Sequence, residues 1–248
     1  MTDASPILEL GLHMELGEDV ALGQAEAVPE MCGPGGSALR TSILATWADV
    51  LTGSLAVVLM GPRIPITLDL QVEVVEPAAP GDAISLEGTV LKRGRSVLVC
   101  ETRLRGAGGS LVAIVHTTFM VSPDPRHVFP EGYRPSVPAP TGRLPVPFAE
   151  RVGCVVGPPG TAEVARQTGG TNAAGAIGGG MVALAAEEAA FSLFDDPRFH
   201  QAMVIRYLRP FNHGPAQAVA ERHGESCLVR VTDVGAQKLG AVATLRPI

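Results

Sequence analysis

Acidic residues stand inside the two most apolar parts of this sequence. Asp49 lies in the apolar stretch 43–60, and Glu187 lies in the apolar stretch 173–194. A buried ionised carboxylate without partners is costly, so each acid needs a hydrogen bond, water in a cleft or a chemical role. Because the two stretches place an acid at equivalent points, we interpret Asp49 as functional rather than as a capping carboxylate. The adjacent Glu188 points about 100° away around a helix, so we expect it to be solvated or at an interface.

A glycine-rich segment, 169–180, directly precedes the second apolar stretch. If it leads into a helix, the free backbone N–H groups and the positive dipole at the helix start can hold a developing oxyanion. Gly179 leaves no side chain to obstruct a substrate. From the residues alone, a flexible connection and an Asx turn at Asn172 are the competing interpretations.

A series of strands follows the first apolar stretch, which we predict to be a long helix. Residues 66–74 alternate strictly between apolar and polar side chains, which is typical of a strand with one buried face. Further strands are predicted at 84–92, 96–105 and 110–121, and the second half repeats the series at 202–209, 216–222, 226–234 and 238–246. A short strand and a glycine-rich approach precede each helix. Short turns between sequential strands indicate antiparallel meanders, so the sequence predicts an α+β fold.

The chain reads as two copies of one unit. Residues 74–77 followed by Gly81 match residues 207–210 followed by Gly214, with a proline four positions before the glycine in both. Between the copies, residues 122–147 hold eight of the 21 prolines, which predicts a semi-rigid linker. The predicted organisation is a unit at 1–121, a linker at 122–147 and a unit at 148–248. We expect the two units to pack as a pseudo-dimer, with helices side by side and sheets continuous.

Composition excludes several classes of protein. The 248 residues are 46% apolar and 18% charged, with a net charge of −6, so disorder is excluded and self-association is expected. No basic run exceeds Lys92-Arg93-Gly94-Arg95, so nucleic-acid binding is not expected. Charges inside both apolar stretches disfavour membrane spans, and no signal-peptide pattern opens the sequence, so we expect a cytoplasmic location.

Cysteine and histidine usage gives no sign of a metal site. The four cysteines lie far apart without a CxxC pattern, and the six histidines lack ligand spacing. They predict reduced thiols, no metal and no cofactor. Arginine greatly outnumbers lysine, which we take as the coding bias of a GC-rich, bacterial genome.

With these motifs, the chain resembles a tandem (double-hotdog) acyl-CoA thioesterase of the phenylacetate-pathway thioesterase-like family. The family pattern is an Asn or Gln, a glycine-rich loop ending in His-Gly-Gly, and an acid eight residues after the first of those glycines. The second half follows it with Asn172, Gly178 in place of the His, Gly179-Gly180 and Glu187. In the first half, Leu44 to Asp49 is similar to the family's helix start, but 40–42 reads Arg-Thr-Ser and Pro34 replaces the amide. The resemblance implies two antiparallel sheets, each wrapped around one central helix.

In the family, the loop comes from one unit and the acid from the other. The resemblance therefore implies a catalytic set of Asp49, Gly179 and Asn172, with Asp49 as general base or nucleophile. The Gly179 N–H would polarise the thioester carbonyl, and Asn172 would orient water or substrate. A second site would combine Glu187 with Thr41, but it lacks the amide and the glycine, so we expect it to be degenerate. Candidate substrate-binding residues are Gly180, Lys92, Arg93 and Arg95.

The expected reaction converts acyl-CoA and water to a carboxylic acid and coenzyme A, which is part of the substrate. Two alternatives remain open: a non-catalytic acyl-CoA-binding or structural hotdog protein, and a hotdog enoyl-CoA hydratase. The hydratase would use another acid/base pair. Asp195 and His200 have a suitable spacing, but they follow their helix, so we interpret residues 195–200 as a loop.

Overall fold

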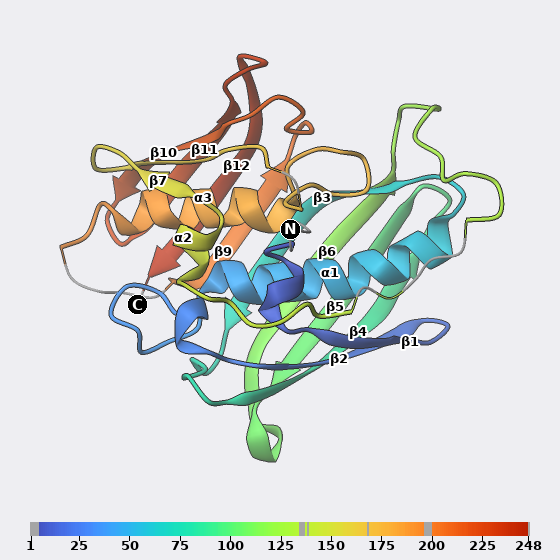
Figure 1. Cartoon of the computed structure of the whole chain (residues 1–248), viewed down its shortest axis with the longest axis horizontal. Coiled ribbons are helices and arrows are strands. Elements are labelled where there is room, and N and C mark those ends of the chain that lie inside the picture. Colours follow the sequence, from blue (N-terminus) through green and yellow to red (C-terminus); the bar gives the residue numbers. More distant parts are fainter. Residues whose placement is uncertain (1–4, 134–136, 138, 168, 196–199, 248) are drawn as a thin grey trace.

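Among the residues described by the computed structural model (5–133, 137, 139–167, 169–195 and 200–247), twelve strands form one antiparallel sheet (Figure 1). The first half holds β1 His13–Leu16, β2 Val20–Glu26, α1 Thr41–Met60, β3 Pro65–Val74, β4 Ala83–Arg93, β5 Val97–Arg105 and β6 Leu111–Val121. The second half holds α2 Phe148–Arg151, β7 Cys154–Val156, β8 Thr161–Val164, α3 Gly179–Phe191, β9 His200–Tyr207, β10 Ala216–His223, β11 Ser226–Asp233 and β12 Lys238–Pro247. Short 3₁₀ turns lie at Leu8–Leu10, Pro29–Met31 and Ala107–Gly109.

The two halves have the same strand order. Read from its outer edge inward, the first half runs β1-β2-β4-β5-β6-β3, and the second runs β7-β8-β10-β11-β12-β9. The eight long strands lie where the alternating pattern predicts them, to within two residues at each end. The sequence predicted one short strand before each helix, whereas the structure has two: β1 and β2 before α1, and β7 and β8 before α3.

The predicted continuity of the two sheets is confirmed, and their description as two separate sheets is corrected, because β3 and β9 join the halves into one sheet. Leu70 pairs with Ile205 and Val72 with Met203 across this join. Each of these strands is the inner edge of its own half, and an edge strand carries unpaired backbone donors and acceptors. Pairing the two edges satisfies both.

Both long helices lie on the same face of the sheet and contact each other (Figure 1). On β3, Leu70, Val72 and Val74 are buried beneath α1, while the alternate residues point to the opposite face. α1 ends at Met60, and Pro62, which follows Gly61, cannot continue the helix. Among the described residues, α1 is long and apolar enough to cross a membrane by length and composition. Because 56% of that window is buried inside the fold, its apolar character matches that of a core helix.

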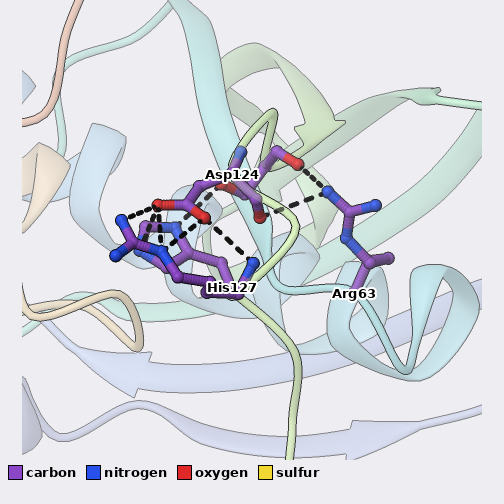
Figure 2. Close-up of polar contacts among 5 residues, drawn as sticks. Arg63, Asp124 and His127 are labelled. Atoms are coloured by element: carbon purple, nitrogen blue, oxygen red, sulfur yellow. Dashed lines mark hydrogen bonds and ion pairs between the residues drawn. The ribbon is translucent and has the colours of Figure 1, made fainter.

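The segment 122–147 is more closely attached to the fold than the linker interpretation implied. Arg63 donates to the backbone oxygens of Ser122 and Asp124. Figure 2 shows Arg63 on one side of Asp124 and His127 on the other. Ser122 Oγ lies 2.8 Å from Nδ1 of His127, and the His127 carbonyl accepts from the N–H of Ile64 at 3.0 Å. The described part of the segment contains neither helix nor long strand, yet these hydrogen bonds fix its start to the connection between α1 and β3.

Candidate functional site

Asp49 is held at the middle of α1 with its carboxylate facing the start of β3. The side-chain hydroxyl of Thr67 donates to Oδ1 at 2.9 Å, which leaves Oδ2 as the second oxygen. Burial raises the pKa of Asp49 to about 6, and the Thr67 hydrogen bond opposes part of that rise. A carboxylate with a pKa near neutrality is suited to accept a proton from water.

The start of α3 approaches the same carboxylate from the other half of the chain. A Cβ placed on Gly179 would lie 3.1 Å from Oδ2 of Asp49 and 3.1 Å from the hydroxyl of Tyr207. A side chain at position 179 would therefore press on the acid. Gly179 is the first residue of α3, where backbone N–H groups have no acceptor within the helix. The geometry brings an acid and a potential oxyanion-binding N–H together, as their sequence positions suggested.

Asn172 lies on the exposed loop before α3, and its side-chain oxygen is committed to that loop. Oδ1 accepts from the backbone N–H groups of Ala174 at 3.0 Å and Ala176 at 3.1 Å. This is the Asx-turn arrangement that the sequence allowed. In this conformation Oδ1 is occupied by the loop and does not orient water. The side-chain amide nitrogen of Asn172 is the atom that can contact a substrate.

These three residues line one cavity of about 370 Å³. It lies between α1, the first residues of β3, the loop before α3 and the N-terminal segment that contains Ser5. Ser5 Oγ donates to the Gly169 carbonyl at 2.6 Å, which fixes the N-terminal segment against the loop. The other lining residues are Ile7, Leu8, Thr46, Val50, Gly53, Ser54, Val57, Pro65, Ile66, Thr67, Phe119, Gly170, Thr171, Ala173, Gly178 and Gly180.

Sequence reasoning missed Tyr207 and Thr67. The Tyr207 hydroxyl donates to the carbonyl of Gly179 at 2.8 Å, and burial together with the nearby Asp49 charge raises its pKa well above the usual value. Tyr207 is therefore a neutral phenol that fixes the first residue of α3. The internal repeat carried a signal for it, since Tyr207 stands where the first half has Val74. Thr67 had no comparable signal, because its contact with Asp49 depends on how α1 packs on β3.

The second candidate site is filled by protein groups. Glu187 is fully buried, and Ser42 donates to it from both its backbone N–H (3.2 Å) and its hydroxyl (2.6 Å). Burial raises the pKa of Glu187, while the Arg40 charge and the Ser42 hydrogen bonds lower it. Thr41 is buried beside Ser42 at the start of α1. Glu187, Ser42 and Arg40 bind one another, which is the arrangement of a structural contact.

Glu188 lies at the interface between the two halves, which is one of the two surroundings predicted for it, and it is not solvated. It is only 8% exposed, and its Oε1 lies 2.6 Å from Arg40 Nη1, the same nitrogen that lies 3.4 Å from Glu187 Oε2. Arg40 directly precedes α1, and its long side chain reaches both Glu187 and Glu188, although these acids point to different sides of α3. The turn of α3 predicts that the two glutamates point apart, but it gives no sign of the cation from the first half that pairs with both.

The proposed substrate-binding residues are dispersed. Gly180 lines the cavity, but a Cβ there would lie 2.1 Å from Thr46 Oγ1, so the glycine is required by the contact between α3 and α1. Lys92, Arg93 and Arg95 lie on the exposed end of β4 and its turn, and none of them is among the described lining residues. The Arg93 guanidinium donates instead to the Leu59 carbonyl at 2.8 Å.

Neither a metal site nor a disulfide is seen in the part of the chain that the structure describes. No group of three His, Cys, Asp or Glu side chains there could hold an ion, and all four cysteines are free. Residues 196–199, within the loop interpreted from the Asp195–His200 spacing, lie outside the described residues.

Comparisons with known proteins define the class of this fold and site. Residues 41–113, which include Asp49 and Thr67, match the family described as the thioesterase superfamily. This match spans 73 of the 248 residues and supports a thioester hydrolase, and the fold of the structure is the hotdog fold.

Two solved structures illustrate the likeness of fold. An acyl-ACP thioesterase from Bacteroides thetaiotaomicron has 12% identity and a TM-score of 0.64, with 92% of this chain and 98% of that chain covered. The 12:0-ACP thioesterase from Umbellularia californica has 11% identity and a TM-score of 0.68, with coverages of 94% and 100%. At these identities the likeness concerns the fold. No curated protein matches the sequence.

Proposed function

We propose that the protein is a tandem, double-hotdog acyl-CoA thioesterase of the phenylacetate-pathway thioesterase-like kind, with one composite active site. One observation carries the proposal: the Asp49 carboxylate of the first half lies against Gly179, which begins the helix of the second half. The cavity there also holds Asn172. The two hotdog units are proposed to span 1–121 and 148–248, with the cytoplasm as the location.

In the general-base form of the mechanism, Oδ2 of Asp49 takes a proton from water. The water oxygen bonds to the thioester carbonyl carbon, and the carbonyl oxygen takes the negative charge. The Gly179 N–H and the positive end of the α3 dipole stabilise this oxyanion. When the intermediate collapses, the C–S bond breaks, the acid leaves, and the proton on Asp49 passes to the coenzyme A sulfur.

A nucleophilic form uses the same atoms. Asp49 Oδ2 attacks the carbonyl carbon, and the C–S bond breaks to give a mixed anhydride and the coenzyme A thiolate, which takes a proton from solvent water. Water then hydrolyses the anhydride, which releases the carboxylic acid and restores the Asp49 carboxylate. Thr67 holds Oδ1 in both forms, so the reactive oxygen is the one that faces Gly179. Tyr207 supports either form by fixing the Gly179 carbonyl and so the direction of its neighbouring N–H groups.

Thiol release from a panel of acyl-CoA substrates, followed with a thiol reagent, tests this function directly. Release supports hydrolysis, whereas binding without release supports a non-catalytic acyl-CoA-binding protein. Hydration of a crotonyl-CoA type substrate without thiol release would support the hydratase alternative. Because two solved structures of the same fold are named as ACP thioesterases, the panel should include each acyl group on acyl carrier protein as well as on coenzyme A.

The site asymmetry gives a sharper test. Asp49→Asn keeps the shape of the side chain while removing the base and nucleophile, so kcat should fall by a factor of about 10² or more. The matched control is Glu187→Gln, the equivalent change in the other half. Its kcat should stay within a few fold of the wild type, because Glu187 is enclosed by Ser42 and Arg40. Loss of turnover in Glu187→Gln with activity retained in Asp49→Asn would reject the assigned site.

A further inference from the structure

Gly53 is a glycine in the interior of α1, one helical turn after Asp49. Glycine in a helix interior is destabilising relative to alanine, so its presence there requires a reason. Close packing is not that reason. A Cβ on Gly53 would meet only the ring of Phe119, at 3.6 and 3.8 Å, which is ordinary contact. Gly180 differs, since a Cβ there would lie 2.1 Å from Thr46.

Gly53 does lie on the face of α1 that lines the catalytic cavity. From the acid onward, the α1 residues in the lining are Asp49, Val50, Gly53, Ser54 and Val57. This spacing describes one face of a helix over two turns, a length of about 12 Å at 1.5 Å per residue. The cavity is therefore a groove that leads from the acid along α1.

The far part of this groove has apolar walls. Pro65 and Ile66 of β3 form one side, and the buried ring of Phe119 lies against Gly53. Ser54 is the polar residue on the helix face, but its hydroxyl donates to the Val50 carbonyl at 2.8 Å. The Ser54 hydroxyl is therefore satisfied within the helix, and the walls of the groove are mainly apolar.

The other half of the molecule provides an internal comparison. The residue four positions after Glu187 is Phe191, in the place that Gly53 occupies after Asp49. Phe191 is buried, and the Arg40 guanidinium lies 5.7 Å from the centre of its ring. The site around Glu187, which protein groups fill, thus has an aromatic side chain at the position where the site around Asp49 has a glycine. Gly53 and the groove are thus found in the half of the molecule whose helix carries Asp49.

The two ends of the cavity differ in exposure. Thr171, Asn172 and Ala173 are exposed at the loop end, whereas Phe119 is buried at the groove end. A thioester carrier is large and polar and must extend into solvent, so it fits the loop end. The acyl chain fits the apolar groove.

We propose that this groove binds the acyl chain of the substrate, with Gly53 keeping it open and Phe119 setting its depth. This inference rests on the proposed thioesterase function and names its substrate class: straight-chain aliphatic acyl thioesters of roughly octanoyl length, from the helix rise. Gly53 and Phe119 are specificity-determining residues, and the catalytic residues are separate from them.

The test measures kcat/KM for a series of straight-chain acyl-CoA substrates from acetyl to palmitoyl, with the full-length protein. We expect wild-type activity to peak near octanoyl. Gly53→Leu should lower kcat/KM for octanoyl-CoA by about tenfold or more, because each lost methylene contact in an apolar pocket has a large effect on specificity. Acetyl-CoA turnover should stay within about twofold of wild type, since a short chain does not reach position 53.

Two further variants and a control complete the design. Gly53→Ala should give a smaller shift in the same direction, and it fits without a clash even if the leucine variant folds poorly. Phe119→Leu should move the optimum toward longer chains. Val58→Leu changes an exposed side chain of α1 that is not among the described lining residues, and it should leave the chain-length profile unchanged.

The outcomes separate this inference from the proposed function. If the wild type releases no thiol from any substrate, the thioesterase function fails. If it is active but Gly53→Ala and Gly53→Leu leave the profile unchanged, the acyl-groove inference fails alone. A uniform loss across all chain lengths, acetyl included, would also overturn it, since the groove would then hold the carrier arm or serve packing.

Discussion

At the level of single residues, the pKa of Asp49 is set by two opposing influences, burial and the hydrogen bond from Thr67. Catalysis needs a basic carboxylate, and burial supplies that basicity by disfavouring the charged form. Thr67 limits the effect through its hydrogen bond to Oδ1. The resulting pKa of about 6 leaves the group mostly ionised at neutral pH.

This pKa predicts the pH dependence of the reaction. The carboxylate must be deprotonated to act as base or nucleophile, so kcat/KM should rise with pH through about 6 and then level off. Measurement of kcat/KM from about pH 4.5 to 8 checks it. A profile that is flat across this range, or one that falls as pH rises through 6, would contradict a catalytic role for Asp49.

The same ionisation should be visible in the free energy of unfolding. The folded-state pKa of Asp49 lies above its value of 3.8 in the unfolded chain, so the folded state binds the proton more tightly. Ionisation therefore lowers stability as pH rises from about 4 to 6, by at most about 3 kcal/mol at 1.36 kcal/mol per unit. Asp49→Asn should remove this part of the slope, which makes it the control that links the kinetic pKa to this residue.

At the scale of elements, the contact between α1 and α3 depends on the size of one residue. Gly180 brings α3 against Thr46, where a Cβ would lie 2.1 Å from the hydroxyl oxygen and 2.9 Å from the Thr46 Cβ. Thr46 Oγ1 itself donates to the Ser42 carbonyl at 2.6 Å, so it is held in place.

Gly180→Ala should therefore separate the two helices and lower the free energy of unfolding by about 1–3 kcal/mol, the usual cost of overpacking. Because the helices carry Asp49 and Gly179, kcat should fall as well. Chemical denaturation and activity measure the two effects. Adding Thr46→Ala should recover part of the stability in a double-mutant cycle. Additive losses would show that the contact is not the cause.

The elements also show which features a sequence reveals. The eight long strands and the two helices were predictable, because burial on one face of a sheet imposes alternation and a core helix is apolar on most sides. The short strands β1, β2, β7 and β8 were not separated, because a few residues carry little periodic signal. Asp49, Gly179 and Asn172 were found as motif positions, whereas Thr67, Tyr207 and the bridging role of Arg40 depend on contacts between distant segments.

At the scale of the whole molecule, two halves of the same strand order carry unequal sites. At one site, glycines at the start of α3 leave space beside Asp49. At the other, Arg40 reaches from the first half to Glu187 and Glu188 of the second. The second site therefore holds a buried ionic contact between the halves in place of an open cavity.

Arg40→Met tests whether this contact stabilises the assembly of the halves. Removing the cation leaves two buried carboxylates without their counter-ion, which should cost about 3–5 kcal/mol in the free energy of unfolding at neutral pH. Burial already raises the pKa of Glu187, and Arg40 is the largest opposing influence. Without Arg40 the folded state should hold a proton on Glu187 still more tightly, so the variant should lose stability as pH rises.

Denaturant unfolding at about pH 5 and about pH 8 measures this sign, with a larger deficit expected at the higher pH. Arg126→Met is the matched control: the Arg126 side chain is 87% exposed and its pairing with Asp124 lies at the surface, so stability should change little. Adding Glu187→Gln and Glu188→Gln to Arg40→Met should restore most of the loss, because neutral amides need no counter-ion and Ser42 can still donate to position 187. If Arg40→Met is as stable as the wild type at both pH values, the filled site contributes nothing to holding the halves together. The β3–β9 pairing and the α1–α3 contact would then account for that stability.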